Sequence, residues 1–442
     1  MRPPAPTVSF TEALCFWVKL GFVNFGGPAG QIALMHRELV GRKRWVGEDR
    51  FLHALNFCMM LPGPEATQLA IYVGWLLHGA AGGLAAGVLF VLPGFLVMLA
   101  LSWIYAVHGS VAWVAAAFFG LRAAVIAVVA DAVVRIGAHT LRRPSAVGIA
   151  TAAFAAIFFF KVPFPAIVIG AALCGWIASR LWPAAPSADE TDHPEQDALR
   201  PPSGPSLRGA ARTLATGLVA WCGPLLAVAL WRGWQDVLAQ QAVFFSKAAV
   251  VTFGGAYAVL AYIAQAAVDW FRWLRPGEML DGLGLAESTP GPLIMVTQFV
   301  GYLGAYRHPG DLDPATAGFL GAAVTTWATF APCFLWIFLG APFVESLRGH
   351  RALQAALGAV TAAVVGVILN LAVWLGIHTL FGDVGETAFG PLRIPLPQPH
   401  SVDGLAVTFV LVARWALVRL RIGVVPLVLA AAAGGLAVHW VL

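Results

Sequence analysis

Residues 19–31 read KLGFVNFGGPAGQ, and residues 247–259 read KAAVVTFGGAYAV, 228 positions later. The same offset places Pro62-Gly63-Pro64 on Pro290-Gly291-Pro292. In both halves of the chain, a Gly-Gly pair is therefore followed by a Pro-Gly-Pro turn at the same spacing. Chance matches among common apolar residues would not hold these motifs in register, so the chain contains two copies of one repeat.

The match between the copies extends beyond the two motifs. Residues 16–64 align with residues 244–292 without a gap, and the alignment pairs Trp45 with Trp273. A shift of two residues then brings Thr67-Gln68 onto Thr297-Gln298. The duplication is therefore a property of a long segment and not of isolated motifs.

The composition is that of a multi-pass membrane protein. Of 442 residues, 59% are hydrophobic and 11% are charged, whereas soluble globular chains carry about 25% charged residues. The net charge of +5 comes from basic residues in loops, which indicates membrane orientation. No nucleic-acid motif is present, so we expect the lipid bilayer and no nucleic acid as a partner.

Cysteine and histidine give no sign of a metal or cofactor. The five cysteines are scattered through apolar segments without a CxxC pair, and no HExxH motif occurs. We expect no disulfide framework, no metal and no cofactor. Residues 1–10 hold one arginine and three prolines, which does not resemble a secretory signal peptide.

Apolar runs of bilayer length divide the chain into six runs, a linker, one run and six more. We expect a first repeat over 8–182, a disordered polar linker over 183–212, a connecting transmembrane helix over 213–236 and a second repeat over 237–442. The linker prediction rests on its richness in Pro, Ser, Asp and Glu, which leaves too little apolar surface to fold. The predicted runs are 10–40, 50–78, 80–107, 111–136, 145–160, 163–182, 213–231, 238–268, 279–305, 314–342, 351–381, 402–419 and 422–442.

The two repeats are expected to be inverted relative to each other. Seven runs separate equivalent points, so seven crossings would turn the second copy upside down. The loop 41–50 carries a net charge of +2 and its counterpart 269–278 a net charge of zero, which favours the cytoplasmic side for the first. These assignments agree only if one interrupted run, 50–78, enters and leaves on the same face. We thus predict an all-α integral membrane protein with two inverted repeats and broken or re-entrant helices.

The glycine and proline motifs predict breaks in the helices. Proline lacks an N–H and fixes φ, so Pro-Gly-Pro prevents a continuous helix. Broken backbone at membrane depth is tolerated only where protein buries it or water reaches it. Each half-helix that begins after a break presents free N–H groups and a positive dipole end, which favour an anion. Four breaks meeting near the midplane could therefore hold one negatively charged ligand, as in other inverted-repeat transporters.

The candidate ligand-binding residues are those of the breaks and the polar residues beside them. An acid such as Glu65, or Glu287 before the second turn, could take up a proton or cap a helix. Lys19 and Lys247 are possible charge partners, since a charge within a span costs about 2.5–3.5 kcal/mol. Snorkelling of these lysines, and helix packing at the Gly-Gly pairs, are the structural alternatives. The candidate set is Asn24, Gly26, Gly27, Pro62, Gly63, Pro64, Glu65, Gln68, Thr252, Gly254, Gly255, Pro290, Gly291, Pro292 and Gln298.

Three further charged residues lie inside the predicted spans. Asp131 and Arg135 are four residues apart, and this spacing predicts a local ion pair on one helix face. Arg122 lies in the middle of a run, and the sequence alone leaves its role open.

The motifs resemble those of the chromate ion transporter family. The resemblance rests on FVNFGGPAGQIALMHRELV (22–40) and LPGPEATQLAIYVGW (61–75) in the first half, and on FFSKAAVVTFGGAYAVLAYI (244–263) and STPGPLIMVTQFVGYLGA (288–305) in the second. It covers the chain apart from the linker and the last two runs. It implies a long-chain, two-domain member that exports chromate across the prokaryotic cell membrane and confers chromate resistance.

Other functions stay open at this point. The alternatives within transport are export of another oxyanion, such as sulfate or molybdate, and a passive anion channel. An enzyme acting on a lipid-linked phosphate would need clustered acids or histidines at one membrane face. The acid cluster of the chain lies within the predicted linker, so we expect a transporter and not an enzyme. The sequence leaves a homodimer open.

Overall fold

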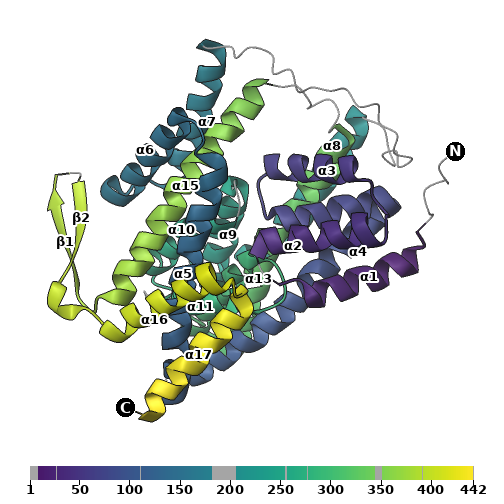
Figure 1. The fold of residues 1–442 in the computed structure, drawn as a ribbon. Coiled ribbons are helices and arrows are strands. Elements are labelled where there is room, and N and C mark those ends of the chain that lie inside the picture. Colours follow the sequence, from purple (N-terminus) through teal and green to yellow (C-terminus); the bar gives the residue numbers. More distant parts are fainter. Residues whose placement is uncertain are drawn as a thin grey trace.

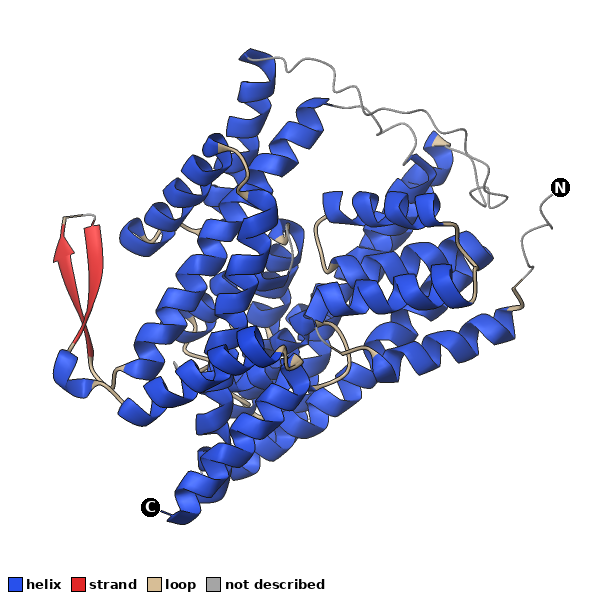
Figure 2. Ribbon diagram, viewed as in Figure 1, coloured by secondary structure: helices blue, strands red, loops and turns tan. Residues whose placement is uncertain are grey.

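The computed structural model describes residues 8–25, 27–109, 111–181, 206–253, 256–275, 277–343, 351–390 and 392–441. Gly26, Gly254 and Gly255 lie outside the described residues, as does the predicted linker up to residue 205. The chain is almost entirely helical, with a single β-hairpin among the described residues (Figure 2).

The described residues of the first half form seven α-helices, four of which have fewer than 18 residues and are shorter than a bilayer span. The helices are α1 (Phe10–Val23), α2 (Gly27–His36) with a π-helical continuation η1 (Arg37–Arg42), α3 (Glu48–Met60), α4 (Glu65–His108), α5 (Ala112–Thr140), α6 (Pro144–Phe160) and α7 (Phe164–Leu181). The helix α8 (Leu207–Arg232) follows and begins ahead of the expected start at residue 213.

The second half repeats this order with small changes. Its elements are α9 (Val237–Val251), α10 (Ala256–Gln265) with η2 (Ala266–Trp270), α11 (Glu278–Ser288), η3 (Leu293–Met295), α12 (Val296–Arg307), α13 (Pro314–Gly340), η4 (Ala341–Phe343), α15 (Arg351–Leu380), η5 (Pro399–Ser401), α16 (Gly404–Trp415) with η6 (Ala416–Leu420), and α17 (Val424–Val441). The α1–α2 and α9–α10 pairs correspond, as do α3 and α11. The single helix α4 corresponds to α12 and α13 together.

The predicted helix breaks are confirmed at both kinds of motif. The first apolar run ends as a helix at Val23 and resumes at Gly27, and the run 50–78 is interrupted between Met60 and Glu65. The helix α2 has 10 residues, and at 1.5 Å per residue it covers about 15 Å. Since the hydrocarbon core is about 30 Å thick, α2 alone would cross only half of it, and η1 extends the helical segment to Arg42.

The long helix α4 is also two segments. Its 44 residues contain a kink at His78 and Gly79, where the backbone leaves helical geometry and Gly79 adopts φ of +61°. The first segment packs as a short helix after the Pro-Gly-Pro turn, and the second is a full-length span. The kink falls between the predicted runs 50–78 and 80–107.

Helix starts follow local capping chemistry. Ser9 accepts a hydrogen bond from the Glu12 N–H at 3.2 Å before α1, and the Ser-x-x-Glu spacing is that of a capping box. Asp236 accepts from the Leu238 N–H at 2.8 Å before α9. Equivalent helices of the two repeats thus start at capping residues of different type.

The β-hairpin lies between α15 and α16, and the apolar runs did not predict it. Strand β1 (Val384–Phe389) pairs antiparallel with β2 (Leu392–Pro397), with Val384 opposite Pro397. In Figure 1 the hairpin projects from the side of the molecule away from α1.

The last three helices of each repeat are exchanged between the repeats. The helix α15 of the second repeat packs against α6 and α7 of the first, whereas α5 of the first packs against α16 and α17 of the second. The helices α5 and α15 also pack against each other. We call α5, α6, α7, α15, α16 and α17 the exchanged bundle. The other helices of the repeats, α1–α4 and α9–α13, form the motif core and lie partly beside the bundle in Figure 1.

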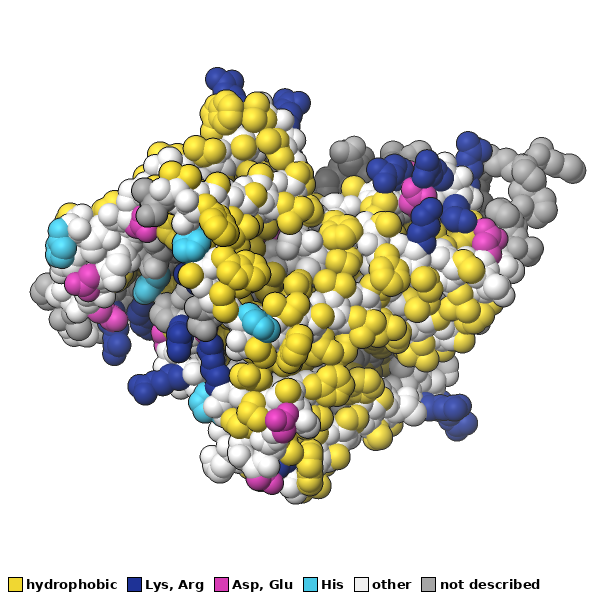
Figure 3. Space-filling model, turned by 90° about the horizontal axis from the view of Figure 1, so that it is seen from below, with side chains coloured by type: hydrophobic (Ala, Val, Ile, Leu, Met, Phe, Trp, Pro, Cys, Tyr) yellow, Lys and Arg dark blue, Asp and Glu magenta, His cyan; other side chains and the backbone are white. Residues whose placement is uncertain are grey.

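Seven helices within the described residues are long and apolar enough to cross a bilayer. Hydrophobic side chains also cover most of the face seen in Figure 3, with charged residues gathered toward its ends. The chain is therefore a multi-pass membrane protein. The seven helices span Glu65–His108, Ala112–Thr140, Phe164–Leu181, Leu207–Arg232, Pro314–Phe343, Ala352–Leu380 and Val424–Val441.

Candidate functional site

Each Pro-Gly-Pro turn is hydrogen-bonded to the Gly-Gly break of the other repeat. The Gly63 N–H donates to the Thr252 carbonyl at 2.7 Å, and the Gly291 N–H donates to the Asn24 carbonyl at 2.9 Å. Asn24 and Thr252 are the C-caps of α1 and α9. The same hydrogen bond therefore occurs twice, once from each repeat to the other. Each one joins the Pro-Gly-Pro break of one repeat to the Gly-Gly break of the other.

The sequence of the turn determines which atom makes this contact. Proline has no N–H, so glycine is the one residue of Pro-Gly-Pro that can donate from its backbone. Gly63 adopts φ of +130° and Gly291 adopts φ of +110°, a region that other residues rarely occupy. The central glycine thus supplies both the bend of the turn and its hydrogen-bond donor.

The second turn is enclosed by one side chain and by closely packed backbone. Gln31 Nε2 of α2 donates to the Gly291 carbonyl at 2.6 Å. Gly94 of α4 lies so close that a Cβ there would stand 2.7 Å from the Pro290 carbonyl oxygen and 3.1 Å from the Gly291 Cα. Residues of the first repeat therefore hold the second turn from two sides.

The first turn is enclosed by side chains instead. Gln68 Nε2 donates to the Pro62 carbonyl at 2.8 Å. A Cβ at Gly63 would stand 2.8 Å from Gln68 Nε2 and 3.2 Å from Cys333 Sγ of α13. Pro64 caps α4. The two turns thus share a backbone contact but differ in what surrounds them.

Several polar side chains around the turns are buried and have no hydrogen-bond partner among the described residues. Both side-chain polar atoms of Asn24 lack one, as do Thr67 Oγ1 and Glu65 Oε2. Asn24 and Thr67 are 0% exposed and Glu65 is 9% exposed. Since buried polar groups normally have partners, these side chains mark a candidate ligand site, with the Asn24 amide and the Thr67 hydroxyl as its donors.

Three buried glutamines use their amide nitrogens on the backbone. Gln31 and Gln68 do so at the turns, and Gln298 Nε2 donates to the Phe95 carbonyl at 2.9 Å. Their side-chain oxygens have no hydrogen-bond partner within the described part of the chain. These side chains stabilise broken or closely packed backbone, and their carbonyl oxygens are left as hydrogen-bond acceptors.

A carboxylate lies at the start of α2. Glu287, one turn before the second Pro-Gly-Pro, is 2% exposed, and Tyr257 donates its hydroxyl hydrogen to Glu287 Oε1 at 2.5 Å. Glu287 Oε2 is 4.0 Å from the position that a Cβ on Gly27 would take. Gly27 begins α2 with φ of +67°. A helix start carries positive potential, so this position accommodates negative charge.

The two repeat-related lysines lie elsewhere. Lys19 on α1 and Lys247 on α9 are both exposed, so the structure does not bring them into the buried cluster. Their role as charge partners stays a prediction. Thr252 is buried, but its hydroxyl donates to the Ala248 carbonyl at 2.7 Å, which leaves its backbone carbonyl as the group that joins the repeats.

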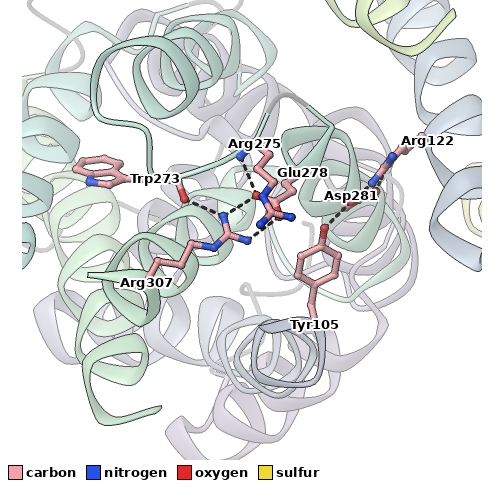
Figure 4. A network of polar contacts seen from close by, with 7 residues as sticks. All are labelled: Tyr105, Arg122, Trp273, Arg275, Glu278, Asp281 and Arg307. Atoms are coloured by element: carbon pink, nitrogen blue, oxygen red, sulfur yellow. Dashed lines mark hydrogen bonds and ion pairs between the residues drawn. The ribbon is translucent and has the colours of Figure 1, made fainter. Parts of the chain in front are cut away.

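A second polar network lies outside the motifs (Figure 4). Asp281 of α11 accepts two hydrogen bonds from Arg122 of α5 and one from Tyr105 of α4. One turn away, Glu278 accepts two from Arg307 of α12, both at 2.6 Å. Arg122, whose role the sequence left open, is thus an inter-repeat ion-pair residue.

The prediction that Asp131 forms a local ion pair with Arg135 is wrong. Asp131 of α5 instead accepts a hydrogen bond from Arg414 Nη1 of α16 at 2.8 Å. The helical spacing allowed the local pair, but the exchange of helices between repeats places another arginine beside Asp131. Sequence spacing holds no information about that partner.

Sequence reasoning also left Gln31 and Tyr257 out of the candidate site. Gln31 is a fully buried amide four residues after the Gly-Gly pair, and Tyr257 follows the second pair by two residues. A polar residue inside an apolar run close to a break was the available signal. The two repeats carry different residues at these positions, so aligning the repeats did not single out Gln31 or Tyr257.

Broken helices from two repeats that meet through their termini are the architecture of a secondary transporter. The sequence profile described as chromate transporter matches residues 11–176 and 239–436. The chain is 33% identical over 373 residues to a chromate transport protein of Pseudomonas aeruginosa, covering 82% of this chain and 80% of that protein. It is 30% identical over 379 residues to a chromate transport protein of Cupriavidus metallidurans, covering 84% of each.

A third relative, a probable chromate transport protein of Synechococcus elongatus, is 29% identical over 409 residues, which cover 89% of this chain and 93% of that protein. No solved structure matches the chain. The chain belongs to the chromate transporter family, and both repeats fall within the family match.

Proposed function

We propose that the chain exports chromate across the inner cell membrane and thereby confers chromate resistance. The substrate class is a tetrahedral dianionic oxyanion, in agreement with the names of the three relatives. The observation that carries the proposal is the reciprocal pairing of each Pro-Gly-Pro turn with the other repeat's Gly-Gly break. This pairing supports the proposal because alternating exposure needs a site to which both repeats contribute.

The oxyanion would bind near the start of α2. The donors there are the first-turn N–H groups of α2 and the Asn24 amide. The carboxylate of Glu287 already lies beside Gly27, which supports an anion at this position. Oxyanion binding at a helix start needs no arginine, because the N–H groups and the helix dipole supply the positive potential.

The energetics favour export over uptake. Moving one charge across 100 mV involves about 2.3 kcal/mol, so two negative charges leaving a negative-inside cell release about 4.6 kcal/mol. We also propose that the two repeats have opposite orientations, because an inverted pair offers the same site to each side of the membrane in turn. No coupled ion is then required for export.

Uptake of radiolabelled chromate into everted vesicles, energised inside-positive, tests this proposal. Saturable uptake that depends on the potential is expected for the unaltered chain. Gly27→Val should abolish it, since a branched side chain strains φ of +67° and enters the space beside Glu287. Gly170→Val is the matched control, because a Cβ at Gly170 of α7 meets nothing within 4 Å.

Three outcomes distinguish chromate export through this site from a different binding site and from a different substrate. Uptake by the control with none by Gly27→Val supports export and the site together. Equal uptake by both variants contradicts the site. No chromate uptake, with sulfate taken up in its place, contradicts chromate as the substrate and favours another oxyanion.

A further inference from the structure

The ion pair between Arg122 and Asp281 joins the exchanged bundle to the motif core. Arg122 Nε is 2.6 Å from Asp281 Oδ1, and Arg122 Nη2 is 2.7 Å from Oδ2. Tyr105 donates to Oδ2 at 2.6 Å. The Asp281 side chain is fully buried, while that of Arg122 is 34% exposed. In Figure 4 Tyr105 and Arg122 reach Asp281 from two different helices.

Small residues on α11 allow α5 to come close enough for this pair. A Cβ on Gly277 would stand 3.1 Å from the Arg122 guanidinium. The space beside Gly284 is filled by the side chains of Leu121 and Val125 of α5. The contact therefore runs along two turns of α11, with the ion pair at its centre.

The first repeat lacks the residues for an equivalent contact. At the offset of 228 residues, Arg50, His53 and Asn56 of α3 stand where α11 has Glu278, Asp281 and Gly284. The surroundings differ as well. Leu52 and Met59 of α3 are 45% and 54% exposed, whereas the aligned Leu280 and Glu287 of α11 are 1% and 2% exposed.

We propose that Arg122, Tyr105 and Asp281 form a latch that closes the exchanged bundle on α11 in one state of the transport cycle and opens in the other. This inference rests on the proposed function, because alternating exposure requires the bundle and the motif core to change their contact. Ionisable residues at membrane depth are costly and are retained for a purpose. A buried pair is favourable only with close, complete hydrogen bonding, so it holds one position and is lost as soon as the helices separate.

The neighbouring pair provides an internal control. Glu278 and Arg307 form an equally close bidentate pair, but both residues belong to the motif core of the second repeat. Movement of the bundle would leave that pair intact. A purely structural role would make the two pairs equivalent, whereas a latch makes only the Arg122 pair sensitive to the state of the protein.

A reversible cross-link across the contact tests whether the bundle moves. Leu121→Cys with Gly284→Cys places two thiols on α5 and α11 where the side chains already touch. Oxidation should join the two thiols and stop chromate uptake into everted vesicles. Reduction with dithiothreitol should then restore the uptake. Each single variant is oxidised in parallel as the control for the native cysteines. Unchanged uptake by the fully cross-linked protein would overturn the latch and leave the proposed function standing.

The yield of the same cross-link, measured in membranes without substrate, tests the ion pair itself. Adding Arg122→Gln to the two cysteines should lower the yield severalfold, because the bundle then spends less time on α11. Arg122→Lys should recover part of the yield. Glu278→Gln removes a buried charge of the control pair and should leave the yield unchanged. Equal yields for Arg122→Gln and Glu278→Gln would overturn the proposal.

These readouts separate the two proposals. Cross-linking yield does not depend on what is transported, so absence of chromate uptake in every variant would contradict the proposed function alone. Loss of uptake on cross-linking, together with a lowered yield in Arg122→Gln, supports both.

Discussion

The α2–α3 and α10–α11 segments descend from one sequence and lie in unlike surroundings. In α3, Leu52 and Met59 are about half exposed, whereas Leu280 and Glu287 at the same positions of α11 are buried. The difference arises because α5 and α17 pack against α11 and α15 packs against α10, while α2 and α3 pack against α4. Duplication has thus preserved the local motifs but not the set of helices packed around them.

The backbone contacts of the breaks are the part that stayed equivalent. Gly63 and Gly291 make the same hydrogen bond to the opposite repeat, and Arg44 and Arg272 share a left-handed backbone with φ of 53° and 56°. The backbone of the motifs and the hydrogen bonds that join each turn to the opposite repeat are therefore symmetric. Features that depend on which bundle helix lies alongside are not.

The largest effect is expected from truncating the buried copy of an aligned leucine pair. Leu280→Ala should lower the free energy of unfolding by about 2–5 kcal/mol, because it leaves a cavity between α11 and its neighbours. Leu52→Ala should cost far less, since that side chain is 45% exposed and lipid is as apolar as leucine. Thermal unfolding of the purified protein in detergent measures both. Equal shifts in Tm would contradict the unequal packing.

A smaller difference is expected between the two turns. Gly291→Ala and Gly63→Ala each force alanine into positive φ, which costs about 1–2 kcal/mol. Gly291→Ala should cost more, because its Cβ meets the Gly94 backbone at 3.1 Å, while Gly63→Ala meets the Gln68 and Cys333 side chains, which can move. The same thermal measurement ranks the two variants. A reversed order would show that the side chains around the first turn are the more rigid.

The carboxylate at the start of α2 should compete with the transported anion. Glu287→Gln removes its charge without changing its size and should lower the KM for chromate roughly tenfold, which corresponds to about 1.4 kcal/mol. Met59→Gln, at the aligned position of the first repeat, is the control and should leave the KM unchanged. Initial rates in everted vesicles give both values. An unchanged KM for Glu287→Gln would place the anion away from Gly27.

The smallest effect is expected from the two lysines that the repeat alignment singled out. Lys19→Gln and Lys247→Gln alter exposed side chains, so neither should shift Tm measurably or change chromate uptake by more than about twofold, as is usual for exposed charges. Paired uptake assays on the two single variants check this. A tenfold loss of chromate uptake in either variant would instead show that the lysine contributes to transport.

The sequence predicted those parts of the fold that depend on nearby residues. Pro-Gly-Pro and the Gly-Gly pairs predicted breaks, and the structure confirms that helices end at Met60 and Val23 and resume at Glu65 and Gly27. Apolar length predicted the long spans of both halves. These predictions succeeded because proline chemistry and span length act within a few turns of chain.

The partners across the repeats could not be read from the sequence. The exchange of α5 and α15 decides that Asp131 meets Arg414 and that Arg122 meets Asp281, and no spacing rule encodes it. For the same reason, Glu287 could be singled out as an intramembrane acid but not placed beside Gly27. The Gln68 and Gln298 side chains were expected to face a ligand, yet their amide nitrogens bond to backbone carbonyls.

The reciprocal hydrogen bonds of the turns set a condition on biosynthesis. When the first repeat has left the ribosome and entered the membrane, the carbonyl that accepts from Gly63 does not yet exist, because Thr252 is still to be translated. An unpaired N–H in hydrocarbon costs several kcal/mol, so the newborn first half must keep this turn near water or under the protection of the insertion machinery. Translation of the second half then supplies the missing partner of each turn, so the first copy reaches its final form only with the second.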